Sequence, residues 1–343
     1  MPRARLQQGR NRRACLEDFL RVAAASLALG ACAAPIEGEQ TQPHVGHAIQ
    51  PIVGGVASGS AQDAVVVLAR FENGARASLC TATLVAANLA LTARHCVSAT
   101  DASAGCGSDG LPVVGALLHG DRDPTTLAVF ATTSGVAPDT SSDYGASAHG
   151  KALVVDASAT SICNHDLAFI VLDTSLTAPI APVRLAPPLM SDALTAVGFG
   201  ITDIGTLPVS RMQRNGIALV GAGPMAYPDD ARYGAGNGEF LVGESACSGD
   251  SGSPALAPSG AVVGVASRAG NGQARDPNNA ASTCLGINAH AVYTELGANT
   301  ALTLAAFKQA GATPWLEGQP DPRVAKKPAD TGPSAGTPSA SGG

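Results

Sequence analysis

One short segment, residues 247–254, places a serine among residues that permit a tight, exposed turn. It reads Cys-Ser-Gly-Asp-Ser-Gly-Ser-Pro, with Ser251 near its centre. Glycine adopts the backbone conformations that such a turn requires. The N–H groups of Gly249 and Ser251 can then converge on an oxygen that gains negative charge during a reaction. The segment predicts a nucleophilic hydroxyl, although a Gly- and Ser-rich stretch taken alone is more typical of an ordinary loop.

A histidine and an aspartate at the ends of apolar runs offer the groups that would activate such a hydroxyl. His95 follows the run Leu89–Thr92 and stands beside Cys96. Asp166 opens the apolar run 167–172, and a carboxylate buried there needs a partner. An imidazole is the most frequent general base in enzymes. We interpret the remaining histidines as ordinary core or surface residues: His44, His47, His119, His149, His165 and His290.

The composition favours a fold built from β-strands. Hydrophobic residues make up 45% of the 343 residues and charged residues 14%, which excludes a disordered chain. With seven Phe, four Tyr and one Trp, the core must consist mainly of Ala, Val, Leu and Ile. The 40 Gly and 23 Pro interrupt the chain too often for long helices. The residues therefore predict an all-β barrel or sandwich.

Short apolar runs with turn-like flanks mark the expected strands. These runs occupy residues 64–69, 89–92, 167–172, 217–220 and 261–267. Residues 97–160 are rich in small and polar side chains, and we expect them to include a surface insertion. One helix is expected near the end of the chain, with Asn299 as its N-cap, Ala310 as its last residue and Gly311 just beyond it.

The first 31 residues have the pattern of an export signal. Six Arg residues precede the uncharged stretch 22–30, which is too short to cross a bilayer and suits the apolar part of a signal peptide. The motif Leu-Gly-Ala-Cys at 29–32 is similar to a bacterial lipobox, so we expect Cys32 to carry a lipid anchor. An ordinary cleaved signal with an incidental cysteine is the alternative, and the Arg pair at 12–13 would suit a twin-arginine signal.

The remaining charges argue against non-specific binding to nucleic acid. Without residues 1–31 the chain has 15 basic and 25 acidic side chains. Non-specific binding to nucleic acid depends on cations at the phosphates, so we expect no nucleic-acid partner. No apolar run approaches the roughly 20 residues that cross a bilayer, which excludes a polytopic membrane protein. The expected location is outside the cytoplasm, either anchored in the cell envelope or secreted.

The cysteine count agrees with export. The chain has eight Cys and no Cys-x-x-Cys motif, which argues against a zinc site. If Cys15 leaves with the signal and Cys32 is acylated, six remain, and six can pair completely in an oxidising compartment. Closing the loop between Cys80 and Cys96 would contribute roughly 3 kcal/mol in the chain-entropy account of disulfide stabilisation.

These motifs together resemble those of the trypsin/chymotrypsin-like serine peptidases. The resemblance covers about residues 52–315 and includes the order His, Asp, Ser along the chain. Its motifs are Ile-Val-Gly-Gly at 52–55, Thr-Ala-x-His-Cys at 92–96, Asp-Leu-Ala at 166–168, Gly-Phe-Gly at 198–200 and Gly-Asp-Ser-Gly at 249–252. The resemblance implies a chymotrypsin-like pair of six-stranded antiparallel β-barrels, with the catalytic residues in the cleft between them.

The resemblance also implies a role for each reactive residue. Ser251 would attack the scissile carbonyl, and His95 would take the hydroxyl proton and later give it to the leaving amine. Asp166 would fix the imidazole tautomer and stabilise the imidazolium. The backbone N–H groups of Gly249 and Ser251 would form the oxyanion hole. This chemistry needs no metal ion and no cofactor.

Two disulfides follow from the family and a third from parity. The family pairings carry over as Cys80 with Cys96 and Cys247 with Cys284, and parity leaves Cys106 for Cys163. Members of the family are usually made as zymogens. The amino group freed at Ile52 would insert and pair with Asp250, a contact that serves better as a switch than as net stabilisation. Pro51 stands where Arg or Lys is common, so the activating protease is unknown.

Substrate preference can be inferred only by matching residues of this sequence to the family's substrate-pocket positions. Ser245 stands where trypsin-like enzymes carry the Asp that binds Arg or Lys. The strand ending at Ser267 would flank the pocket, and Ala269 and Ala291 stand where members with wide pockets tend to have Gly. We therefore expect small or medium apolar side chains to fit. Arg268 replaces the usual aromatic residue after Ser267 and leaves the neighbouring subsite undefined.

The sequence thus predicts an exported serine endopeptidase. Its expected parts are a signal peptide at 1–31, a propeptide or linker at 32–51, a protease domain at 52–315 and a disordered tail at 316–343. Its expected partners are protein or peptide substrates and an activating protease. The alternative is a catalytically silent binding protein on the same fold. A purely structural lipoprotein would not require His95, Asp166 and Ser251 together.

Overall fold

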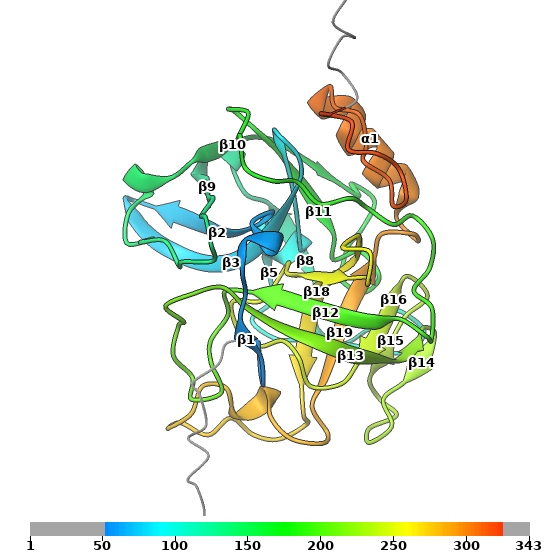
Figure 1. The fold of residues 1–343 in the computed structure, drawn as a ribbon. Helices are drawn as coiled ribbons and strands as arrows, with labels where there is room; N and C mark the ends of the chain where they lie inside the picture. The colour runs from blue at the N-terminus through cyan, green and yellow to red at the C-terminus, as the bar shows by residue number, and fades with distance from the viewer. Residues whose placement is uncertain (1–51, 325–343) are drawn as a thin grey trace, which may run out of the picture. The chain divides into compact units, whose positions relative to one another are not determined.

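The computed structural model describes residues 52–324. The predicted signal peptide, the lipidation site at Cys32, the segment up to Pro51 and residues 325–343 lie outside the described residues. Within 52–324 the chain forms a succession of antiparallel strands and one α-helix, as Figure 1 shows. No helix in this part of the chain is long and apolar enough to cross a membrane.

The first half of the described chain forms a closed six-stranded barrel with the order β10-β11-β4-β3-β2-β9. Its strands are β2 (Val65–Glu72), β3 (Ala75–Ala86), β4 (Leu89–Thr92), β9 (Leu127–Phe130), β10 (Ala148–Val155) and β11 (Ala168–Leu172). Successive side chains of a strand point to opposite faces. Val66 and Leu68 therefore belong to one core cluster, whereas Val65 and Val67 belong to another, which includes residues of the second barrel.

The second half forms the other barrel. Its strands are β12 (Ala193–Gly198), β13 (Met212–Ala222), β16 (Glu239–Val242), β17 (Pro254–Leu256), β18 (Val262–Gly270) and β19 (His290–Glu295). They follow the order β13-β12-β17-β18-β19-β16, and a pairing between β13 and β16 closes the ring. Strand β1 (Val56–Ala57) adds to the edge of β13. Two closed six-stranded antiparallel barrels confirm the predicted chymotrypsin-like fold.

The insertion in the first half is shorter than the expected range of 97–160. It consists of two small ladders that span residues 98–121, in which β5 (Ser98–Thr100) pairs with β8 (Leu118–Asp121) and β6 (Ala104–Cys106) pairs with β7 (Pro112–Gly115). The later residues of the expected range include β9 and β10, which are strands of the first barrel. All four residues of β9 are buried, which explains why this apolar run cannot belong to a surface loop.

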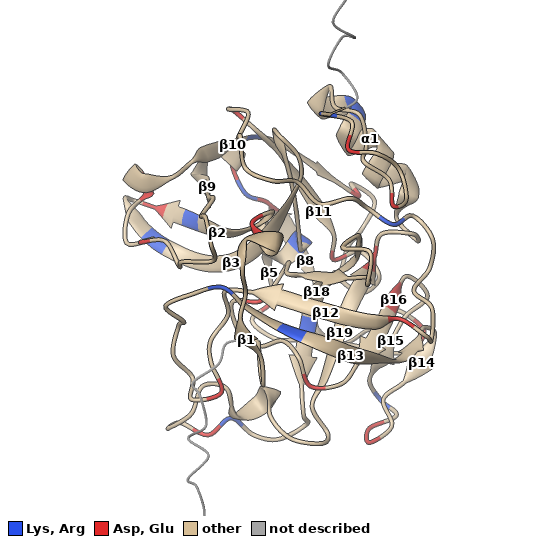
Figure 2. Ribbon diagram, viewed as in Figure 1, with Lys and Arg blue, Asp and Glu red and all other residues tan. Residues whose placement is uncertain are grey.

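Short elements connect the barrel strands. In the second half, β14 (Met225–Ala226) pairs with β15 (Gly234–Ala235). Five 3-10 helices lie in the connections of residues 52–324: η1 (Ser60–Gln62), η2 (Arg94–Cys96), η3 (Pro124–Thr126), η4 (Asp143–Gly145) and η5 (Ser282–Cys284). Figure 2 shows basic and acidic residues interspersed along the loops and strands of both barrels.

The single α-helix of residues 52–324, α1 (Thr300–Ala310), begins and ends where the sequence predicts. Asn299 precedes it, but its side chain donates a hydrogen bond to the carbonyl oxygen of Glu295 and does not cap the helix. Gly311 ends the helix in the left-handed region with φ 65°. The helix follows the second barrel in sequence, yet it packs against β4, β10 and β11 of the first, and its Phe307 is buried there.

Folded structure continues beyond residue 315, the expected end of the domain. Leu316 forms a β-bridge with Val183, and the Glu317 carboxylate pairs with the Arg184 guanidinium at 2.6 Å. The Arg323 side chain donates a hydrogen bond to the carbonyl oxygen of Ala178. Residues 316–324 therefore belong to the folded domain and not to the tail that the sequence predicts, because their polar groups find partners on it.

Candidate active site

The pairing of β4 with β11 brings His95 and Asp166 to the same end of the first barrel. The two strands run antiparallel, with Thr92 opposite Ala168. The chain that leaves β4 and the chain that enters β11 therefore meet. His95 lies in η2 just after β4, where the disulfide between Cys80 and Cys96 fixes its neighbour to β3.

Three hydrogen bonds hold the Asp166 carboxylate. Its Oδ2 lies 2.7 Å from His95 Nδ1, and its Oδ1 accepts the backbone N–H of His95 at 2.8 Å. The hydroxyl of Ser267, from β18 of the second barrel, donates to Oδ2 at 2.6 Å. Asp166 is fully buried, whereas 21% of the His95 side chain is exposed. The carboxylate therefore fixes the imidazole so that its other nitrogen, Nε2, is the one free to react.

Asp166 and His95 each stabilise the charged form of the other. Burial alone would raise the pKa of Asp166, but the His95 imidazole and the three hydrogen bonds outweigh it and hold the pKa below its ordinary value. Burial opposes protonation of His95, but the neighbouring Asp166 carboxylate outweighs it and raises the pKa of the imidazole. The arrangement suits a histidine that gains a proton during a reaction and returns it.

The turn before β17 carries Ser251 to this end of the first barrel. The N–H of Thr81, in β3, donates to the carbonyl oxygen of Ser251 at 2.9 Å. The Sγ of Cys96, the residue after His95, lies 3.7 Å from the same oxygen. Among the described residues, the Ser251 hydroxyl makes no hydrogen bond to the imidazole of His95. Such contacts are often long without substrate and tighten in the Michaelis complex.

The same turn leaves two backbone N–H groups without a protein acceptor in the described part of the chain. Gly249 adopts φ 95°, and a Cβ there would lie 2.8 Å from the Cα of Gly200, so that only glycine fits. Its carbonyl oxygen accepts the Thr81 hydroxyl at 3.0 Å. Within residues 52–324, the N–H groups of Gly249 and Ser251 donate to no protein acceptor. Both donors therefore remain available to a ligand.

Asp250 points inward from the turn. Its side chain is fully buried, and its carboxylate accepts the N–H of Gly200 at 2.8 Å and the N–H of Cys247 at 3.0 Å. Burial raises the pKa of this carboxyl to about 7, against the opposing effect of the two hydrogen bonds. Asp250 in this form has no cation to pair with among the described residues. An ammonium group brought to this place would stabilise its charged form.

This raised pKa predicts how the stability of the uncleaved chain depends on pH. The folded chain keeps the Asp250 proton up to about pH 7, whereas the unfolded chain loses it near pH 4. The free energy of unfolding should therefore decrease as the pH rises from about 4 to 7. Asp250→Asn should abolish most of this decrease, measured by denaturant unfolding at a series of pH values. The exposed Asp143→Asn is the matched control, and equal pH dependence in both variants would contradict the assignment.

The residues expected to line a substrate pocket separate into two groups. A pocket of about 150 Å³ lies beside Ser251 and is lined by Ser267 and Ala269, together with residues around both cysteines of the Cys247–Cys284 disulfide. Ser245 is 1% exposed and Ala291 is 1% exposed, and neither lines it. Ala291 lies opposite Ala269 on the neighbouring strand of the β18–β19 ladder.

Two residues near the site have roles that sequence reasoning did not assign. Thr81 binds the nucleophile turn through both its N–H and its hydroxyl, and Glu239 binds Arg268. Ser267 was expected only to flank the pocket, but it also donates to Asp166. The position of Thr81 next to Cys80 is the only sequence signal for its role, and Glu239 is a charged residue in the otherwise apolar segment 239–242.

One group of side chains within residues 52–324 has the spacing of metal ligands. Atoms of Cys80, His95 and Cys96 lie within 4.8 Å of one another. The two sulfur atoms are joined to each other in a disulfide, so they are not free to bind a metal as thiolates.

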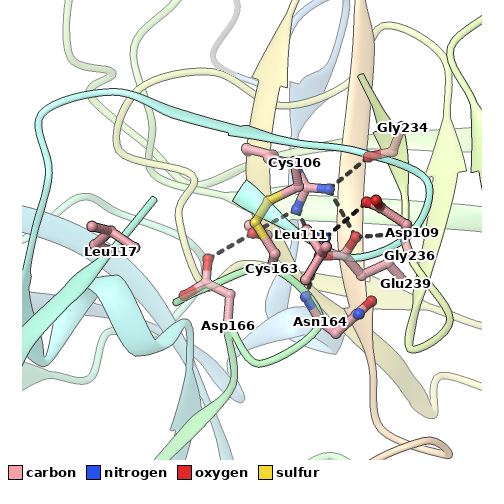
Figure 3. The surroundings of a disulfide bond; sticks show 12 residues. Cys106, Asp109, Leu111, Leu117, Cys163, Asn164, Asp166, Gly234, Gly236 and Glu239 are labelled. Carbon is pink, nitrogen blue, oxygen red and sulfur yellow. Dashed lines mark hydrogen bonds and ion pairs between the residues drawn. A yellow bond between two sulfur atoms is a disulfide. The ribbon is translucent and has the colours of Figure 1, made fainter. Parts of the chain in front are cut away.

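The third predicted disulfide, between Cys106 and Cys163, is present as well and ties the insertion to the residues before Asp166 (Figure 3).

Two antiparallel barrels with histidine, aspartate and serine side chains near their junction define a chymotrypsin-like protein. A family model described as Trypsin matches residues 52–285, more than half of the chain, and the chain belongs to this family of serine proteases. Among solved structures it is similar to the scabies mite inactivated protease paralogue S-D1, with 17% sequence identity and a TM-score of 0.52. The match covers 77% of this chain and 100% of that one, and it shows a shared fold. No curated protein matches the chain.

Proposed function

We propose that the protein is an exported serine endopeptidase that hydrolyses peptide bonds through an acyl-enzyme on Ser251. The observation that carries the proposal is the buried Asp166–His95 pair, with its 2.7 Å hydrogen bond, on the strand ends that face the Ser251 turn. A structural role alone would not require a buried carboxylate, a partly exposed imidazole and a glycine-rich turn at one place.

The proposed reaction follows from the positions of these groups. Ser251 Oγ attacks the peptide carbonyl carbon while His95 Nε2 takes the hydroxyl proton, and Asp166 stabilises the imidazolium. The N–H groups of Gly249 and Ser251 bind the oxyanion. The tetrahedral intermediate collapses, the C–N bond breaks, and His95 gives its proton to the leaving amine. Water, activated by His95, then hydrolyses the acyl-enzyme and regenerates the serine.

We also propose that cleavage after Pro51 activates the protein. The Ile52 side chain is buried, and both it and Asp250 lie against Gly198: a Cβ there would be 3.2 Å from Ile52 Cδ1 and 2.2 Å from Asp250 Oδ1. Ile52 adopts φ 49° in this form, a conformation that is strained for a β-branched residue. A free ammonium at Ile52 would give the buried Asp250 carboxylate a counter-charge. The protease that makes this cut is an unassigned partner.

The pocket beside Ser251 supports a preference for small or medium apolar side chains. Its lining includes Ala266, Ser267 and Ala269. Arg268 also lines it, but the Arg268 charge is paired with Glu239, and Ser245, which does not line it, carries no charge. Peptides with Arg or Lys before the cut should have a kcat/KM roughly 100-fold lower than peptides with apolar residues there, because a desolvated cation without a partner costs several kcal/mol. Cleavage of a peptide library measures this preference, and a profile dominated by Arg and Lys would contradict it.

The proposed location is outside the cytoplasm. Three disulfides among the described residues are consistent with an oxidising compartment. We propose that residues 1–31 direct export and that Cys32 carries a lipid anchor, with release as a secreted protein as the alternative. Mass spectrometry of the amino terminus of the exported chain, before the cut after Pro51, distinguishes an acylated Cys32 from an ordinary signal cleavage.

Labelling with a fluorophosphonate tests the function and the activation together. This probe forms a covalent bond with an activated serine, and peptide mass spectrometry locates the adduct. We expect an adduct on Ser251 in the chain cleaved before Ile52 and at least tenfold slower labelling of the uncleaved chain. A cleaved, folded chain without any adduct would support the catalytically silent binding protein instead.

A further inference from the structure

A buried ion pair lies behind the Asp166 carboxylate. Arg268, in β18, directs Nη1 to Glu239 Oε1 at 2.6 Å and Nη2 to Oε2 at 2.7 Å, so the contact is bidentate. The Arg268 side chain is 7% exposed and the Glu239 side chain is fully buried. Nη1 also lies 3.5 Å from the hydroxyl of Ser267. Because that hydroxyl faces a cation on one side, its single proton is directed to Asp166 on the other.

The Glu239 carboxylate holds the chain that leads to Asp166. Oε1 accepts the N–H of Asn164 at 3.0 Å, and Oε2 accepts the N–H of Gly236 at 2.8 Å. Asn164 adopts φ 67° and directly follows Cys163, whose disulfide to Cys106 fixes the same segment to the insertion. Figure 3 shows the disulfide, Asn164 and Glu239 gathered beside Asp166. Glu239 therefore acts on Asp166 in two ways. It binds the backbone before Asp166 directly, at Asn164, and it binds Arg268, which in turn contacts the Ser267 hydroxyl.

We propose that Arg268 and Glu239 are positioning residues that fix the Asp166 carboxylate and set the electrostatic potential at His95. Arg268 acts through the Ser267 hydroxyl, and Glu239 acts through Asn164 and through the charge of Arg268. The catalytic part of this inference rests on the proposed function, whereas the effect on His95 rests only on the described contacts.

The energetics of the pair favour a role beyond stability. A buried ion pair loses much of its Coulombic attraction to desolvation, and a well-packed apolar pair is often equally stable. Here the two terminal nitrogens of the guanidinium instead reach three acceptors, since Nη2 also donates to the carbonyl oxygen of Gly234 at 2.8 Å. The buried Nε has no hydrogen-bond partner among the described residues. Such a network restricts the orientation of Arg268, and with it the orientation of the Ser267 hydroxyl, to one geometry.

The charged and titratable groups around His95 come from several elements. Asp166 faces it directly, Arg268 and Glu239 lie behind Asp166, and Tyr227 lies against Arg268. Three further groups lie nearby with partners or orientations of their own: Arg94 pairs with Asp121, His165 pairs with Asp156, and Asp250 points inward from the serine turn. Among these, Arg268 and Glu239 are opposite charges that can be removed one at a time.

Titration of the His95 imidazole by NMR, in the full uncleaved chain, tests the inference without requiring activity. Arg268→Gln leaves the Glu239 charge and should raise the pKa of His95 by roughly 0.5 to 1 unit. Glu239→Gln leaves the Arg268 charge and should lower it by a similar amount. Arg268→Lys keeps the charge and should restore the original value. A structural role alone would not shift the pKa in opposite directions, and shifts of the same sign or no shifts would overturn the proposal.

A neutral double variant keeps the test valid if a single variant fails to fold. Glu239→Gln/Arg268→Gln leaves no unpaired charge and is expected to fold. In the cleaved enzyme it should reduce kcat at least tenfold with KM changed less than threefold, because the Ser267 hydroxyl loses the cation that orients it. A kcat within twofold of the unmodified enzyme would overturn the positioning role. If the unmodified enzyme itself shows no hydrolysis, the proposed function fails while the NMR titration still decides the effect on His95.

Discussion

Replacement of Ser251 by alanine is expected to reduce kcat by about 10⁶-fold while the protein folds normally. The alanine has no oxygen to attack the peptide carbonyl, so the acyl-enzyme cannot form. The oxyanion donors and the substrate contacts remain, and they should leave a residual rate above that of the uncatalysed reaction. The measurement is steady-state hydrolysis of an apolar peptide by the cleaved protein, with circular dichroism to show that the fold is intact.

Ser253→Ala is the matched control for this variant. Ser253 lies two residues further along the same turn and is fully buried. It stands where the family usually has glycine, but it does not adopt a positive φ, unlike its neighbour Gly252 with φ 78°. The same chemical change there should keep kcat within about threefold. Hydrolysis by Ser251→Ala at a rate similar to that of the control would refute the nucleophile.

Asp166→Asn should reduce kcat by about 10⁴-fold. The carboxylate accepts three hydrogen bonds, from the backbone and ring of His95 and from Ser267. An amide has only one oxygen, so its NH₂ group must face a donor or force His95 into the tautomer with the proton on Nε2. In that tautomer the imidazole cannot accept the proton of Ser251. Nitrogen NMR of His95 should show the change of tautomer alongside the loss of kcat.

One of the three other aspartate–histidine pairs within residues 52–324 serves as a control for Asp166→Asn. Asp156 Oδ2 lies 2.9 Å from His165 Nδ1, but both side chains are partly exposed, at 30% and 41%. Asp156→Asn should keep kcat within about twofold because solvent compensates for the lost contact. If Asp166→Asn retains more than a tenth of the original kcat, the proposed role of Asp166 is wrong.

The strand pattern could be predicted because local signals and the fold agree. The run Leu89–Thr92 is a strand with those bounds, and the run 167–172 forms β11 with a start one residue later. Apart from Thr92, whose hydroxyl donates to the carbonyl oxygen of Thr81, both runs are apolar on both faces. One face fills the barrel and the other is covered by neighbouring parts of the protein. Once these strands pair, the residues that flank them, His95 and Asp166, must lie close together.

The contacts behind Asp166 could not be predicted because they depend on long-range register. Arg268 and Glu239 lie 29 residues apart in different strands, and no spacing rule connects them. Neither did the sequence distinguish the insertion from β9 and β10, since all of residues 97–160 is rich in small residues. Asn299 shows a similar limit: the helix begins where expected, but the side chain finds a tertiary acceptor and not the helix N–H groups.

The return of α1 to the first barrel links the order of synthesis to the order of folding. Residues 300–310 are among the last parts of the domain to be made, yet they cover apolar surface on β4, β10 and β11, which are made early. The strands of the first barrel are therefore complete by residue 172, but part of their outer surface stays uncovered until residues 300–310 are made. For the export proposed above, we expect that this late contact leaves the early barrel without its finished packing while the chain is still being made.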